Sequence, residues 1–199
     1  PSPPAPLPPK GGRGVIPRRL ALAVTGLLFA CNVALAAPPK WAVDPAKSSL
    51  QFVVDVNGQT VVGRFKAFGA LIAFDPADLA QSSAKITIDM TEAKSGDATR
   101  DAMLLKPDWF NVLDFPQAVF QTTSFTPKGG NAYEARGKLT LKGATREIIL
   151  PLTIAIAGDT ATAKGEVTLK RTEFSVGKGG QFDTDKPVAL GVKVLVNVT

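Results

Sequence analysis

Residues 137–150 read Gly-Lys-Leu-Thr-Leu-Lys-Gly-Ala-Thr-Arg-Glu-Ile-Ile-Leu, and this stretch decides the fold class. Apolar Leu139 and Leu141 alternate with polar residues, a Lys-Gly pair interrupts the run, and the alternation resumes from Ile148. Alternation of period two around a glycine-containing break predicts a β-hairpin with one apolar and one polar face. Because a single hairpin cannot bury its apolar face alone, the stretch also predicts further strands of the same kind.

Strands of this kind recur on both sides of the hairpin. The expected strands cover residues 50–56, 61–66, 72–74, 85–89, 118–122, 133–141, 146–156, 160–169 and 188–198. Asn57-Gly58 separates the first two, and this dipeptide is the strongest two-residue hairpin signal in the chain. About eight or nine antiparallel strands predict a closed barrel or sandwich, since closure removes the exposed strand edges.

The periodicity changes in residues 95–106. Asp97 suits a helix N-cap, because its carboxylate can accept a hydrogen bond from a backbone N–H of the first turn. Met103 and Leu104 follow near the end of the pattern, so we expect one short helix here. Residues 108–116 are too rich in aromatic side chains for an ordinary solvent loop, and we expect them to close one end of the core.

The N-terminal residues 1–36 differ in composition from the rest of the chain. Residues 1–19 are rich in proline and glycine without an apolar period, so we expect them to be disordered. An arginine pair, the apolar run 20–30 and Ala-Leu-Ala at 34–36 then follow the order of a charged region, a hydrophobic region and a small-residue cleavage site. The pattern predicts a secretory signal peptide that is cleaved after Ala36.

Two other interpretations of this leader stay open. Residues 20–37 reach the length of a membrane span and could remain as an uncleaved anchor. The sequence Leu-Phe-Ala-Cys ending at Cys31 resembles a lipidation box. All three interpretations place the body of the chain, residues 37–199, outside the cytoplasm, and the first predicts a periplasmic protein.

The composition gives little support to nucleic-acid binding or to common catalytic chemistry. Residues 1–36 contain four of the 23 basic residues and none of the 17 acidic ones, so the body is close to neutral despite the net charge of +6. No run of basic residues interleaved with aromatics follows, so no nucleic-acid partner is expected. The sequence contains no histidine, and its one cysteine lies in the leader. We therefore expect no catalytic residues, no metal and no cofactor.

The order of motifs from Trp41 to about Val198 resembles the YceI-like family of periplasmic, lipocalin-like, polyisoprenoid-binding proteins. The residues that carry the resemblance are Trp-Ala-Val-Asp at 41–44, Ser-Leu-Gln-Phe at 49–52, Val-Val-Gly-Arg-Phe at 61–65, Arg100-Asp101 with 108–116 and Phe120, Gly-Lys-Leu-Thr-Leu-Lys-Gly at 137–143, and Lys-Arg-Thr-Glu-Phe at 170–174. The resemblance implies an antiparallel eight-stranded barrel with one helix near its mouth, holding a long isoprenoid chain or a quinone tail. This chain lacks the histidines that the family often carries near the first hairpin and before the helix.

The inner faces of the expected strands and the segment after the helix supply an apolar wall that suits a hydrocarbon. The candidate ligand-binding residues are Phe52, Val54, Phe65, Ile72, Phe74, Ile88, Met103, Leu104, Trp109, Phe110, Phe115, Phe120, Leu139, Phe174 and Val194. Arg64 and Lys66 are candidates for contact with a polar headgroup. A stripe of alternating apolar residues is also typical of a filled core, and the two cations equally fit a solvated strand face.

The predicted function is a carrier that holds a long isoprenoid lipid or quinone and exchanges it with membranes through transient contact. An extracytoplasmic stress or interaction scaffold with a filled core is the alternative, and an enzyme is a third. The sequence leaves open the identity and length of the lipid, the pathway and the oligomeric state, a homodimer included.

Overall fold

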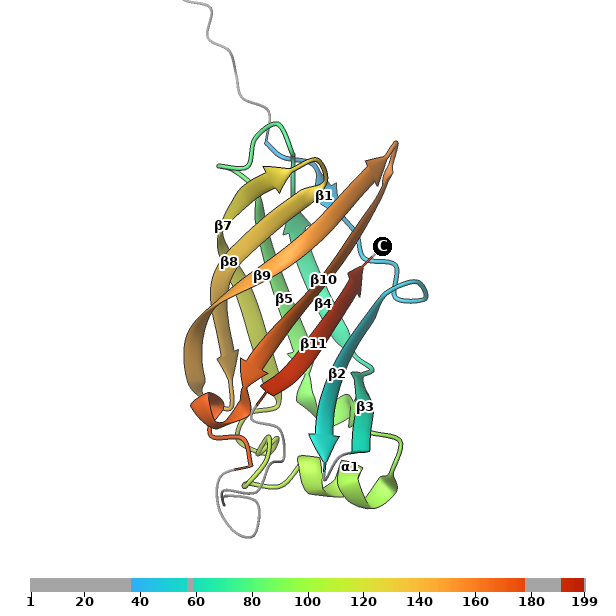
Figure 1. Ribbon diagram of the computed structural model, residues 1–199, viewed down its shortest axis with the longest axis vertical. Coiled ribbons are helices and arrows are strands. Elements are labelled where there is room, and N and C mark those ends of the chain that lie inside the picture. Colours follow the sequence, from blue (N-terminus) through green and yellow to red (C-terminus); the bar gives the residue numbers. More distant parts are fainter. Residues whose placement is uncertain (1–36, 57–58, 178–190, 199) are drawn as a thin grey trace, which may run out of the picture. The chain divides into compact units, whose positions relative to one another are not determined.

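The computed structural model describes residues 37–56, 59–177 and 191–198 (Figure 1). The chain divides into two units, Pro1–Leu35 and Ala36–Thr199, and all described residues belong to the second. The predicted leader, the Asn57-Gly58 turn and the start of the last predicted strand lie outside the described residues. Backbone positions alone are described for residue 56 and for residues 191–198.

One antiparallel sheet of eleven strands forms the body, in the order β1-β4-β5-β7-β8-β9-β10-β11-β2-β3-β6. The strands are β1 (Lys40–Trp41), β2 (Ser49–Val56), β3 (Gln59–Phe65), β4 (Phe68–Ala73), β5 (Ser83–Asp89), β6 (Ala93–Lys94), β7 (Gln117–Gly129), β8 (Ala132–Leu141), β9 (Ala144–Ala157), β10 (Thr160–Lys170) and β11 (Gly191–Val198). The sheet curls strongly, and β3, near one end of its strand order, is joined to β4, near the other end, by residues 66 and 67 alone (Figure 1). The mainly β, antiparallel architecture predicted from the sequence is confirmed, with eleven strands in place of the expected eight or nine.

Residues 137–150 form the turn and flanks of the β8–β9 hairpin. Leu141 pairs with Ala144 across the turn. Lys142 and Gly143 have positive φ angles of 48° and 74°. Two-residue hairpin turns whose twist matches the flanking strands need positive φ at both central positions, which glycine adopts without steric cost. The predicted hairpin is therefore present, and both strands extend well beyond it.

The predicted helix is α1 (Ala98–Leu104), and the carboxylate of Asp97 caps it by accepting a hydrogen bond of 2.8 Å from the N–H of Arg100. Two 3-10 segments, η1 (Met90–Glu92) and η2 (Arg171–Phe174), complete the helical elements of the described residues. In that same part of the chain, no helix has both the length and the hydropathy needed to cross a bilayer.

Two-residue strands, which the sequence did not predict, lie at both ends of the sheet order. Trp41 of β1 pairs with Ile72 of β4. At the other end, β6 pairs with Arg64 and Phe65 of β3. Both strands are too short for a recognisable period, which is why the alternation of apolar residues did not reveal them.

Candidate ligand-binding cavity

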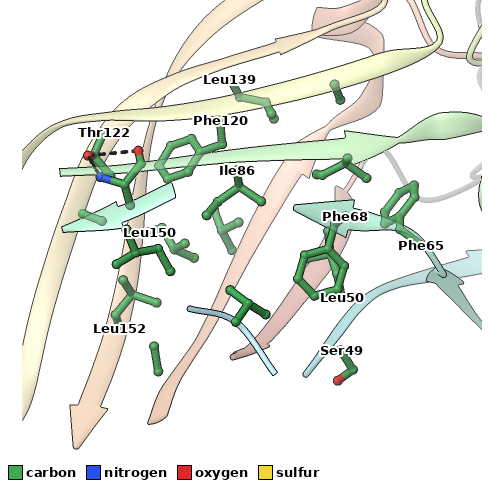
Figure 2. A pocket seen from close by; sticks show the side chains of 18 of the residues that line it. Ser49, Leu50, Phe65, Phe68, Ile86, Phe120, Thr122, Leu139, Leu150 and Leu152 are labelled. Carbon is green, nitrogen blue, oxygen red and sulfur yellow. Dashed lines mark hydrogen bonds between the residues drawn. The ribbon is translucent and has the colours of Figure 1, made fainter. Parts of the chain in front are cut away.

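A cavity of about 1120 Å³ lies inside the curled sheet. Inward-facing side chains of the strands β2 to β5 and β7 to β10 supply most of its wall, and Figure 2 shows several of them converging, among them Leu50, Ile86, Phe120 and Leu150. Successive residues of a strand point to opposite faces of the sheet. The period-two pattern of the sequence is thus what places one apolar set on this wall.

Strands β9 and β10 illustrate the pattern. Leu150 and Ile154 are buried on the cavity side of β9, whereas Ile149, which directly precedes Leu150, is 39% exposed and does not line the cavity. On β10, small Ala163 lines the cavity opposite Ile154. Where a small residue faces a large one across paired strands, the short side chain leaves space in the interior.

A polar residue of the wall, Thr122, forms its hydrogen bonds within the protein. Thr122 of β7 lines the cavity, but its hydroxyl oxygen accepts a 2.8 Å hydrogen bond from the N–H of Ala84 and donates one of 3.2 Å to the carbonyl oxygen of Ala84 (Figure 2). A hydroxyl paired in this way need not be satisfied by a ligand. This part of the wall is accordingly apolar in effect.

The exposed lining residues gather at one end of the cavity. They come from β1, from residues 42–47 and from the β9–β10 turn around Asp159. Lys47 forms an ion pair of 3.2 Å with Asp44, and this contact lowers the pKa of Asp44. We infer that this charged rim is the mouth of the cavity. Helix α1, three of whose residues also line the cavity, lies at the other end of the sheet from the β9–β10 turn (Figure 1).

The end near α1 is lined by buried side chains. Phe174 is 1% exposed, and Arg171 is 6% exposed. Nη1 of Arg171 donates hydrogen bonds of 2.8 Å to the carbonyl oxygens of Val176 and Gly177. The guanidinium thus holds the chain that follows η2 against this end of the cavity.

Most of the predicted site residues line this one cavity. They are Phe52, Val54, Phe65, Ile72, Phe74, Ile88, Met103, Leu104, Trp109, Phe110, Phe120, Leu139 and Phe174. Phe115 is not among the lining residues, and its ring lies beside Gly143 of the β8–β9 turn. Val194 lies on β11 opposite Phe52 and Val167, and its side chain is outside the described set.

Arg64 and Lys66, the two candidate headgroup residues, do not line the cavity. Both side chains are exposed, and both border a second depression, which Gln117 also lines and which shares Leu50 and Phe65 with the cavity. On β3 the inward positions alternate with the outward ones, and Phe65, which follows Arg64, takes the cavity side. A headgroup inside the cavity would therefore meet other residues first.

The candidate residues did not include the inward face of β9 or of β10. Leu150, Leu152 and Ile154 of β9 and Val167 of β10 all line the cavity. The signal that could have identified them is the same alternation that predicted these strands. Alternation of apolar and polar residues predicts an apolar face, but it does not distinguish a face that lines a cavity from one that packs in a filled core.

An antiparallel sheet curled around a large apolar cavity defines a lipocalin-like binding architecture. Residues 41–199 match the family model described as YceI-like domain. The chain therefore belongs to the YceI-like family, as the sequence motifs had indicated.

Relatives and solved structures agree with this assignment. Protein YceI of Escherichia coli O157:H7 is 30% identical over 141 residues, which cover 70% of this chain and 73% of that protein. The crystal structure of BcnA of Burkholderia cenocepacia is 37% identical with a TM-score of 0.75, and the match covers 78% of this chain and 98% of that one. A polyisoprenoid binding domain from Saccharophagus degradans, implicated in plant cell wall breakdown, has the same fold at 14% identity and a TM-score of 0.63, covering 79% of this chain and 95% of that domain.

Proposed function

We propose that this protein is a periplasmic carrier that holds a long isoprenoid lipid, a polyprenyl chain or the tail of a quinone, in the cavity of its sheet. The observation that carries the proposal is the apolar cavity of about 1120 Å³. Pockets for drug-sized ligands typically measure about 300 to 1000 Å³, so this space suits a ligand of considerable length. The polyisoprenoid binding domain with the same fold supports the same class of ligand.

The energetics favour exchange over permanent capture. Burial of apolar surface is worth roughly 0.8 kcal/mol per CH₂ relative to water, so a five-carbon isoprene unit contributes on the order of 3 to 4 kcal/mol. Relative to a bilayer the gain is close to nil, because both environments are apolar. We therefore expect the protein to take lipid from one membrane and release it to another through transient contact.

The leader supports the proposed location. Residues 18–36 have the order of a secretory signal peptide, and each of the three interpretations of the leader places the body outside the cytoplasm. A periplasmic carrier would meet lipids of the membranes that enclose it.

Binding, and not catalysis, is the role that the cavity supports. Its ionisable lining groups include Arg100, whose guanidinium donates to the hydroxyl of Ser95, and the Asp44–Lys47 ion pair at the rim. These contacts are structural. The alternative of a scaffold with a filled core is less well supported, because the interior holds a large cavity.

A transfer assay tests the proposal. Donor vesicles that contain a fluorescent prenyl quinone are mixed with acceptor vesicles, with and without the purified protein. We expect the protein to accelerate transfer and to carry quinone in the vesicle-free fraction. Failure to extract or deliver any isoprenoid would contradict the carrier function.

A further inference from the structure

Three glycines on the inner face of the sheet each lie beneath a large side chain of the neighbouring strand. The pairs are Gly63 with Phe52, Gly137 with Phe120, and Gly165 with Leu152. A Cβ added at these glycines would lie between 2.0 and 2.6 Å from the nearest side-chain atom, which is closer than van der Waals contact allows. The large side chains line the cavity, and the glycines lie behind them. Each glycine therefore lets a bulky side chain lie flat against the wall.

At Gly63 the contact between an added Cβ and a side chain can be studied without a close backbone contact. Gly63 of β3 pairs directly with Phe52 of β2, and the three nearest atoms to an added Cβ all belong to the Phe52 ring. At Gly137 and Gly165, by contrast, a backbone carbonyl oxygen also lies within 2.6 Å of the added Cβ. The nearest contact of an alanine at position 63 is thus the far end of a side chain and not the backbone. Because the ring lies on the cavity side of Gly63, it has to move into the cavity.

The Phe52 side chain lies between the charged rim and the α1 end of the cavity. Its ring centroid lies 5.2 Å from that of Phe65, which lies 6.2 Å from that of Phe110. The N–H of Phe110 donates a 2.9 Å hydrogen bond to the carbonyl oxygen of Leu104, the last residue of α1. This row of rings therefore leads from the middle of β2 to the end of the cavity opposite the charged rim.

We propose that Gly63 determines how deep a hydrocarbon chain enters the cavity. With glycine at this position the Phe52 ring lies against β3, and a chain that enters at the rim passes it to reach Phe65 and Phe110. Gly63 is then a specificity-determining residue for chain length. The inference rests on the proposed function, since it assigns a depth to the same lipid site.

The test compares Gly63→Ala with Gly69→Ala in the purified full chain. Gly69 of β4 is a matched control, because an added Cβ there meets no atom within 4 Å. The probes are geraniol, geranylgeraniol and solanesol, which are prenyl alcohols of increasing length, and binding is followed by tryptophan fluorescence. We expect Gly63→Ala to bind geraniol like the wild type and to bind solanesol roughly tenfold more weakly or worse, as overpacking by a methyl group implies. Gly69→Ala should show the wild-type profile throughout.

A second pair of variants separates the ring from the glycine. In Phe52→Leu the ring is absent, so adding Gly63→Ala should leave the chain-length profile unchanged. This pair also decides the matter if Gly63→Ala alone does not fold. Equal solanesol affinity of wild type and folded Gly63→Ala, or a tenfold loss of solanesol affinity when Gly63→Ala is added to Phe52→Leu, would overturn the inference while leaving the proposed function intact. A wild type that binds none of the three alcohols would overturn both.

Discussion

The indole N–H of Trp41 donates a hydrogen bond of 2.9 Å to the carbonyl oxygen of Phe74. The N–H of Phe74 in turn donates one of 3.1 Å to the carbonyl oxygen of Pro39. Trp41 belongs to β1 and Phe74 follows β4, and both side chains line the cavity. These bonds tie the start of the body to the cavity wall at the charged rim.

The substitution Trp41→Phe removes the indole donor and leaves a part-buried carbonyl oxygen without this partner. We expect it to lower the free energy of unfolding by about 1 kcal/mol, the usual net contribution of one hydrogen bond, and to speed the release of bound lipid. Urea unfolding and a stopped-flow release assay measure the two effects. Tyr133→Phe is the control, since it keeps the ring that contacts Phe74 with centroids 5.4 Å apart. Equal release rates for the two variants would show that Trp41 does not hold the rim.

A ligand that binds only the folded protein stabilises it by mass action. At a free concentration of about one hundred times the Kd, geranylgeraniol should raise the free energy of unfolding by about 2.7 kcal/mol. Thermal unfolding with and without the alcohol measures this shift. A Tm that stays constant over the whole titration would mean that the cavity does not take the prenyl chain.

A polar side chain on the cavity wall should reduce that shift. Ile86 of β5 lines the cavity, whereas Leu71 on the neighbouring strand β4 is 75% exposed on the outer face. An amide against a hydrocarbon chain loses hydration at a cost of about 1 to 3 kcal/mol. We therefore expect Ile86→Asn to weaken prenyl binding by one to two orders of magnitude and Leu71→Asn to leave it unchanged. Similar losses in both variants would point to a general effect on folding.

Asp101 of α1 should make the free energy of unfolding depend on pH. The hydroxyl and the N–H of Ser95 donate hydrogen bonds of 2.7 and 2.6 Å to its carboxylate, and they lower the pKa of Asp101 below the ordinary value of 3.8. Because the folded-state pKa is the lower one, this stabilisation is present above pH 3.8 and is lost as the pH falls through the folded-state pKa. We expect Asp101→Asn to be less stable than the wild type near neutral pH, with a difference that shrinks under acid. Denaturant unfolding across this range measures it, and a difference independent of pH would contradict the assignment.

Much of the fold could be predicted because its signals are local. Alternating residues defined the long strands, and Lys142-Gly143 and Asp97 marked a turn and a helix start that the structure contains. The strands β1 and β6 were missed because two residues carry no period. Their pairing depends on tertiary contacts such as the Trp41 hydrogen bond.

The site was less predictable for a geometric reason. Alternation assigns Phe120 and Leu150 to an apolar face, but the same pattern fits a filled core and the wall of a cavity. Whether space remains depends on pairs across strands, such as Phe52 over Gly63, that are distant from any sequence motif for binding. Phe115 illustrates the limit, since an aromatic residue in the expected segment packs on the β8–β9 turn instead.

The most direct test of the central claim is native mass spectrometry of the protein isolated from its host envelope, followed by organic extraction and identification of the bound lipid. We expect a stoichiometric isoprenoid, and the headgroup of that lipid would distinguish a quinone from a polyprenyl phosphate. A lipid-free mass that persists after incubation with added isoprenoids would contradict the account and favour the scaffold.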